Sequence, residues 1–109
     1  MARKTLGIST IKVLHSVATG CCYGFDIMDA TSLPSGTVYP ALSRLERAGF
    51  VTAKWEDHKK AQREKRPPRK YYAITRAGRE KLVDAAERLR ELQRLLPMPS
   101  GQARMAGDS

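Results

Sequence analysis

Cysteine and histidine are scarce in this sequence, and their scarcity excludes several classes of protein. The only two cysteines, Cys21 and Cys22, are neighbours, and adjacent cysteines are a poor basis for the disulfide framework of a small secreted domain. We expect both to be reduced, small, buried residues. The only two histidines, His15 and His58, lie in no recognised metal-ligand spacing and in no Ser-His-Asp or Cys-His set. Because a Gly-rich phosphate loop is also missing, the sequence predicts no metal site, no cofactor and no enzyme.

Long apolar runs and acidic residues are scarce as well. No stretch of about 18 apolar residues could span a bilayer, and residues 1–4 are followed by no apolar signal-peptide core, so we expect a cytoplasmic protein with no membrane partner. The 11 Asp and Glu residues face 20 Lys and Arg residues, which leaves a formal net charge of +9. Such an excess attracts polyanions. The partner we expect is therefore nucleic acid.

The residues that are present have the periodicities of helices and strands, in an order that one domain of 109 residues can hold. The expected elements are helices over residues 5–19 and 23–30, a turn over 31–36, a third helix ending near 48, strands over 50–55 and 69–74, and a last helix over 76–96 capped by Thr75. This α+β order is that of a winged helix-turn-helix domain with a long C-terminal dimerisation helix.

Three parts of this unit are expected to have different tasks. Residues 1–75 form the winged helix-turn-helix DNA-binding domain, and residues 76–97 form a dimerisation helix of the same compact unit. Pro97 and Pro99 end that helix, and residues 98–109 are expected to be a disordered tail.

The third predicted helix has one apolar and one polar face. Pro40 has no N–H to donate, so we expect it in the first turn, with Ser35 or Thr37 as the N-cap. The N-terminal residues of such a helix commonly reach base edges in the major groove of DNA. Tyr39 has two interpretations, since it could pack on the strands or donate its hydroxyl to a phosphate. The predicted DNA-contacting residues of this helix are Ser35, Gly36, Thr37, Tyr39, Ser43, Arg44 and Arg47.

A basic wing is predicted between the two strands. From Lys54 to Lys70, eight basic residues face three acidic ones, so this segment carries +5 of the net charge of +9. Residues 56–68 are polar and are expected to project as a loop too long for a tight turn and unable to bury itself. Cations on such a ribbon could follow the phosphates or enter the minor groove. The predicted wing contacts are Lys59, Lys60, Arg63, Lys65, Arg66, Arg69 and Lys70.

The last predicted helix carries a leucine seam. Leucines recur every seven residues, and an alanine and a leucine, also seven residues apart, occupy the other apolar position of the heptad. The seam could fold back on the first helix of its own chain, or pair with a second chain in a twofold dimer, and we favour the dimer. The predicted dimerisation residues are Leu6, Ile11, Leu82, Ala85, Leu89, Leu92 and Leu96. A twofold protein would read a palindromic operator.

Less specific interpretations stand beside these. The basic segment could be a solvated, disordered loop, and the polar face of the third helix could be an ordinary surface. The alternative function is a winged-helix protein-interaction module or RNA-binding adaptor that uses the wing alone. We favour a sequence-specific DNA-binding transcriptional regulator, acting as a repressor, because the helix face and the basic ribbon occur together.

The same residues resemble the PadR family of transcriptional regulators. The string Gly-Thr-x-Tyr-Pro-x-Leu-x-Arg-Leu-Glu-x-x-Gly at Gly36–Gly49 is specific, it continues in Arg69–Gly78, and the resemblance extends over about 6–96. It implies a dimeric repressor whose last helix packs against the partner's first helix, and a small-molecule effector, planar and aromatic in some relatives, near the dimer interface. The chain departs from the family in a shortened turn before the third helix and in its only tryptophan, Trp55, which lies on a strand.

Overall fold

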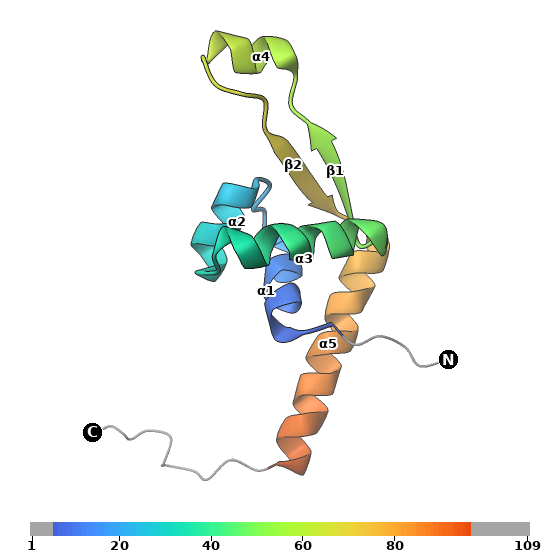
Figure 1. Cartoon of the computed structure of the whole chain (residues 1–109). Helices are drawn as coiled ribbons and strands as arrows, with labels where there is room; N and C mark the ends of the chain where they lie inside the picture. The colour runs from blue at the N-terminus through green and yellow to red at the C-terminus, as the bar shows by residue number, and fades with distance from the viewer. Residues whose placement is uncertain (1–5, 97–109) are drawn as a thin grey trace, which may run out of the picture.

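The computed structural model describes residues 6–96 and contains six of the expected elements together with one additional helix. In chain order these are α1 (Ile8–Ala18), α2 (Gly24–Thr31), α3 (Ser35–Arg47), β1 (Val51–Trp55), α4 (His58–Arg63), β2 (Lys70–Ile74) and α5 (Arg76–Leu95). Figure 1 shows α1, α2 and α3 gathered together, the two-stranded ribbon rising from them with α4 at its tip, and α5 extending the opposite way. The predicted tail over 98–109 lies outside the described residues.

A single small core holds the three N-terminal helices together. Each of them contributes one apolar face, and Tyr72 and Val51 of the ribbon close the core from the side. Fully burying a leucine- or isoleucine-sized side chain stabilises a fold by about 1.5–3 kcal/mol, so this cluster dominates stability. Its buried members are Val13, Leu14, Val17, Ile27, Val38, Ala41, Leu42, Leu45, Val51 and Tyr72.

The turn between α2 and α3 is short. It consists of residues 32–34, and Ser32 adopts a left-handed conformation with φ of 59° at the end of α2. The expectation that Ser35 or Thr37 caps α3 is wrong, because Pro34 occupies the N-cap position and no side chain caps the helix. The Pro34 carbonyl instead accepts from the N–H groups of Thr37 and Val38, at 2.9 and 3.0 Å.

Pro40 therefore lies farther into α3 than expected. It is the sixth residue of a helix that begins at Ser35, and not a first-turn residue. A proline inside a helix removes the hydrogen bond to the carbonyl four residues earlier, which here belongs to Gly36. Gly36 is exposed, so water can satisfy that carbonyl.

The two strands form an antiparallel ribbon with Val51 opposite Ile74 and Trp55 opposite Lys70. Both strands begin one residue later than the sequence predicts. The Tyr72 N–H donates to the Cys22 carbonyl at 2.8 Å, and Tyr23 forms an isolated bridge with Tyr71. The ribbon is thus hydrogen-bonded to the segment between α1 and α2.

The start of α5 is fixed firmly to the ribbon. The Thr75 hydroxyl accepts from the Gly78 N–H at 3.0 Å, which confirms the predicted cap, and donates to the Gly49 carbonyl at 2.7 Å. Gly78 packs against the Phe50 carbonyl so closely that a Cβ there would overlap its oxygen. Beyond Leu82, which is half-buried against the core, α5 extends away from the ribbon and past the start of α1 (Figure 1).

The cysteines only partly match the expectation of burial. Cys21 is half-buried against the core, whereas Cys22 is exposed, and both thiols are free. Within residues 6–96, His, Cys, Asp and Glu side chains form no cluster that could hold a metal ion. None of the helices described is long and apolar enough to cross a membrane.

Gly78→Ala tests the contact between α5 and the ribbon. The added methyl group would overlap the Phe50 carbonyl oxygen, so we expect overpacking to lower the free energy of unfolding by about 1–3 kcal/mol. Chemical denaturation of both proteins measures the change. Gly36→Ala is the matched control, because a Cβ at this helical glycine meets nothing within 4 Å, and it should be neutral or stabilise by up to about 1 kcal/mol. Equal losses in both variants would contradict the packing described.

Candidate nucleic-acid interface

The outer face of α3 is a continuous solvent-facing row. Gly36, Pro40, Ser43 and Arg47 are spaced by four, three and four residues, and therefore lie along one side of the helix. All four are exposed, whereas Val38, Ala41, Leu42 and Leu45 on the opposite side are buried. Because the core anchors the helix from behind, the row is held rigidly outward and is free to enter a groove. We refer to these four residues as the outer row.

The remaining predicted residues of α3 flank the outer row. Ser35 is exposed and Thr37 is half-buried. Tyr39 is 46% exposed, and its ring lies against Gly24 at the start of α2, where any Cβ would overlap it. Tyr39 thus packs on α2, and it also interacts electrostatically with Tyr72 of β2, so the contact with Gly24 does not exclude either interpretation of Tyr39. Its aromatic ring supports the angle between the two helices of the helix-turn-helix.

Arg44 reaches back toward the core side of the fold. Its guanidinium donates to the Thr10 hydroxyl on α1 at 3.0 Å, and Thr10 is only 5% exposed. This hydrogen bond joins α1 to α3. Arg44 therefore helps to hold α3 against α1, a role that the sequence does not predict.

The wing is not the featureless loop that the sequence suggests. Residues 58–63 form α4, and the Asp57 side chain accepts from the Lys59 N–H at its start. Ala61 turns inward and is 1% exposed. A single small apolar residue among charged ones carries no periodic signal, which explains why the helix escapes prediction.

A buried carboxylate closes the base of the wing tip. Glu56, whose side chain is 4% exposed, forms a bidentate ion pair with Arg66, at 2.6 Å from Nη1 to Oε1 and 2.7 Å from Nη2 to Oε2. Oε1 of Glu56 also accepts from the Arg69 backbone N–H at 3.1 Å, and Arg66 pairs with Glu64 as well. The hydrogen bond from Arg66 lowers the pKa of Glu56 from 4.5 to about 2, and Glu56 in turn raises the pKa of Arg66. We call this arrangement the wing clamp.

The seven predicted wing cations fall into groups with different surroundings. Lys59, Lys60, Arg63 and Lys65 are exposed at the tip. Arg66 belongs to the wing clamp. Arg69 and Lys70 lie at the end of the ribbon next to the wing tip, where the Arg69 guanidinium stacks 4.4 Å above the centre of the Tyr23 ring.

Lys70 connects the ribbon to α3. Its Nζ lies 3.8 Å from the Glu46 carboxylate and 5.7 Å from the centre of the Trp55 ring. Sequence reasoning missed Glu46, Trp55 and Tyr23 as partners of the basic residues. The only available signal was that aromatic and acidic residues are interspersed among the cations, which is too weak to identify pairs.

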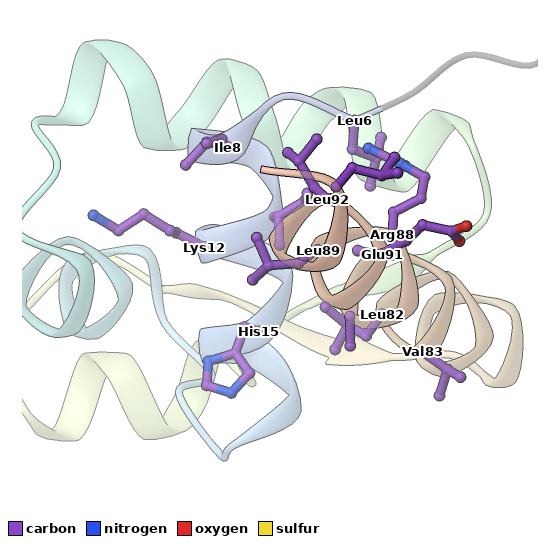
Figure 2. Close-up of a pocket in the computed structure, with 14 residues that line it drawn as sticks. Leu6, Ile8, Lys12, His15, Leu82, Val83, Arg88, Leu89, Glu91 and Leu92 are labelled. Carbon is purple, nitrogen blue, oxygen red and sulfur yellow. The ribbon is translucent and has the colours of Figure 1, made fainter. Parts of the chain in front are cut away.

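A second surface feature is an apolar groove between α1 and α5. Its volume is about 920 Å³, and Figure 2 shows Leu89 and Leu92 projecting from α5 toward α1. Of the predicted dimerisation residues, Leu6, Ile11, Leu82 and Ala85 are half-buried along the groove, and Leu89, Leu92 and Leu96 are at least half exposed. Leu96 lies outside the lining. Ile8, Val83 and Leu95 are exposed apolar residues of the same groove that the heptad pattern did not select.

Comparison with known proteins identifies the class of fold. The chain resembles a PadR family transcription regulator from Clostridium difficile, with a TM-score of 0.71, 23% identity, and coverage of 83% of this chain and 95% of that one. It also resembles BpsR from Bordetella bronchiseptica, whose DNA binding is regulated by 6-hydroxynicotinic acid, with a TM-score of 0.69, 16% identity, and coverage of 92% and 73%. A third similar structure is PadR from Bacillus subtilis in complex with operator DNA, with a TM-score of 0.62, 22% identity, and coverage of 86% and 51%. These likenesses confirm the winged helix-turn-helix fold.

The family follows from the sequence match. The model of the transcriptional regulator PadR-like family matches residues 13–84, which is well over half of the chain, and the protein belongs to that family. No curated protein shows a significant match to the chain. Membership in a family of regulators agrees with the expectation that the chain is not an enzyme.

The wing clamp predicts a specific acid sensitivity. Because the pKa of Glu56 in the folded wing lies below its ordinary value, the stability that the ion pair contributes is fully present above about pH 4.5 and is lost as the pH falls toward 2. In an NMR titration, the Glu56 carboxyl carbon should titrate near pH 2, and the Ala61 amide signal should change with it. In Arg66→Gln the midpoint should rise toward 4.5. A midpoint already near 4.5 in the unmodified protein would contradict the clamp.

Proposed function

We propose that the protein is a sequence-specific DNA-binding transcriptional regulator that places α3 in the major groove and its wing on the adjacent backbone. The observation that carries this proposal is the outer row of α3, which is exposed and held from behind by the core. A helix fits the major groove, where each base pair presents a distinct pattern of donors and acceptors. Ser43 can donate or accept, and Arg47 can donate to guanine or to phosphate.

The wing supports the same mode of binding. Lys59, Lys60, Arg63 and Lys65 are exposed at the end of a ribbon that rises from the C-terminal end of α3 (Figure 1). A cation-bearing arm beside a groove-binding helix would neutralise phosphates and release their counterions. Base contacts on α3 would supply specificity, and the arm would supply affinity that depends strongly on salt.

The proposal includes a twofold dimer formed through the groove between α1 and α5. Val83, Leu89, Leu92 and Leu95 are each at least 50% exposed, and contiguous apolar patches of this kind mark protein interfaces. The leucine seam of α5 is better suited to a second helix than to solvent. Two copies of α3 related by a twofold axis would read two inverted half-sites, a palindromic operator.

Repression, a cytoplasmic location and an effector complete the proposal. A dimer seated on an operator that overlaps a promoter would exclude the polymerase. The effector would bind in the part of the groove between α1 and α5 that the partner chain leaves uncovered, since the groove of one chain, at about 920 Å³, is at the upper end of the range of small-molecule sites. Trp55 lies on β1 and does not line this groove, so an aromatic effector would be held there by aliphatic side chains.

The helix and the wing make separable predictions for DNA binding. Duplexes enriched by the protein from a randomised pool, and shuffled duplexes of the same composition, are compared by fluorescence anisotropy at several salt concentrations. Ser43→Ala should weaken binding to the enriched duplex by about 1–3 kcal/mol and leave binding to the shuffled duplex nearly unchanged. Lys59→Ala with Arg63→Ala should weaken both alike and reduce the salt slope by about 2.

Matched controls lie on α5, outside the groove. Gln93→Ala also removes one exposed polar side chain, and Arg79→Ala with Arg90→Ala removes the same charge from another surface. Both controls should bind nearly as the unmodified protein does. If no sequence is enriched from the pool, or if only the wing substitutions matter, base reading by α3 is refuted and the wing-only adaptor is favoured.

Leu89→Asp tests the dimer. Leu89 is 58% exposed in one chain, so a charge there should leave the monomer fold intact and prevent pairing, and sedimentation should report half the mass of the unmodified protein. Phe25→Asp is the control, because Phe25 on α2 is also exposed, at 72%, but lies outside the groove. A monomeric mass for all three proteins, or a dimer that survives Leu89→Asp, would exclude this interface.

A further inference from the structure

The helix at the wing tip has little reason to form by itself. Its six residues, His58–Arg63, are far fewer than an isolated helix needs in water. Lys59 and Lys60 lie in its first turn, where the helix dipole disfavours cations. Lys59 and Arg63 are four residues apart, so they are like charges on neighbouring positions and repel one another. Something outside the helix must therefore hold it.

The contacts that hold it converge on the wing clamp. Two hydrogen bonds join the two segments that connect the tip to the ribbon. The Glu56 N–H donates to the Arg69 carbonyl at 2.8 Å, and the Arg69 N–H donates to Glu56 Oε1. The Arg66 N–H donates to the Ala61 carbonyl at 3.1 Å, so the residue that pairs with Glu56 also caps the end of α4. Glu56 and Arg66 thus tie both ends of the tip to the ribbon.

The clamp determines which side chains face outward. Ala61 is buried, and at 100° per residue Lys59 and Arg63 lie on the opposite side of α4, with Lys60 beside them. All three are exposed. Arg66, by contrast, is neutralised by two carboxylates, those of Glu56 and Glu64. Helix α4 therefore presents three exposed cations on one face, Lys65 is exposed beyond its end, and Arg66 is half-buried in the wing clamp.

We propose that Glu56 and Arg66 are positioning residues whose ion pair folds the wing tip into a preformed surface for the sugar-phosphate backbone of duplex DNA, with Lys59, Lys60 and Arg63 as its contacts. This inference rests on the proposed function and deepens it. A preformed surface binds more tightly than a flexible arm of equal charge, because fewer rotamers and backbone angles are fixed on binding. The sequence predicts that Arg66 contacts DNA directly. In this proposal it acts indirectly, by positioning Lys59, Lys60 and Arg63.

Substitution of Glu56 separates this account from one based on charge alone. Glu56→Gln makes the wing more positive, so a simple electrostatic arm would bind DNA more tightly. With the clamp broken, we expect binding to the enriched duplex to weaken by about three- to tenfold and the salt slope to fall, since fewer phosphates are engaged at once. Glu87→Gln makes the same charge change on an exposed position of α5 outside the groove and should leave affinity equal or slightly increased.

A double-mutant cycle assigns the role of Arg66. Arg66→Gln should weaken binding at least as much as Glu56→Gln, because it also removes a positive charge, and the double variant should be no weaker than Arg66→Gln alone, because the same clamp is lost in each case. If Arg66 contacts phosphate directly, Glu56→Gln will tighten binding, Arg66→Gln will weaken it and the effects will add. That pattern would overturn the inference.

Hydrogen exchange on the free protein gives a readout that does not depend on DNA. Glu56→Gln should accelerate amide exchange over residues 58–66 and leave α1 and α3 protected as before. Equal protection of the tip in both proteins would overturn the inference. If the unmodified protein fails to bind DNA, the proposed function is overturned. If the unmodified protein binds and the Glu56→Gln variant binds equally or more tightly, only the role of the clamp is overturned.

Discussion

The structure depends on the burial of one face of α3 in a core too small to cover both faces. Val38, Ala41, Leu42 and Leu45 enter that core together with apolar residues of α1 and α2, and a helix with half its circumference buried must expose the rest. The rigidity of the outer row is a consequence of this packing. Two further contacts hold α3 in place. Arg44 donates a hydrogen bond to Thr10 on α1, and Tyr39 packs on Gly24 of α2.

Charge in this protein is organised at two levels. The excess of basic residues, which the composition alone reveals, provides attraction toward any polyanion. The arrangement of those residues is set by a few acidic partners: Glu56 holds Arg66 inside the wing, and Glu46 holds Lys70 near α3. Cations that lack such partners at the wing tip are the ones available for phosphate. A net charge therefore overstates the number of contacts that the wing can make.

The elements that a regular pattern encodes are those that the sequence predicts well. The apolar spacing of α3, the strand composition of β1 and β2, and the threonine cap of α5 all appear in the structure within one or two residues. Features that depend on contacts between distant residues were missed. The clamp joins positions ten residues apart, α4 depends on one buried alanine, and the start of α3 depends on the carbonyl of Pro34 instead of a capping side chain. None of these follows a period or a motif.

The central claim, that the outer row of α3 meets the bases, is tested most directly by NMR. Addition of duplex DNA to the isotope-labelled protein should shift the backbone and side-chain signals of Gly36, Ser43 and Arg47, with smaller shifts at the wing tip and little change along the exposed polar side of α5. Shifts confined to the wing would indicate that the protein contacts only the sugar-phosphate backbone of the DNA. Signals of α3 that stay unmoved at saturating DNA would contradict the account.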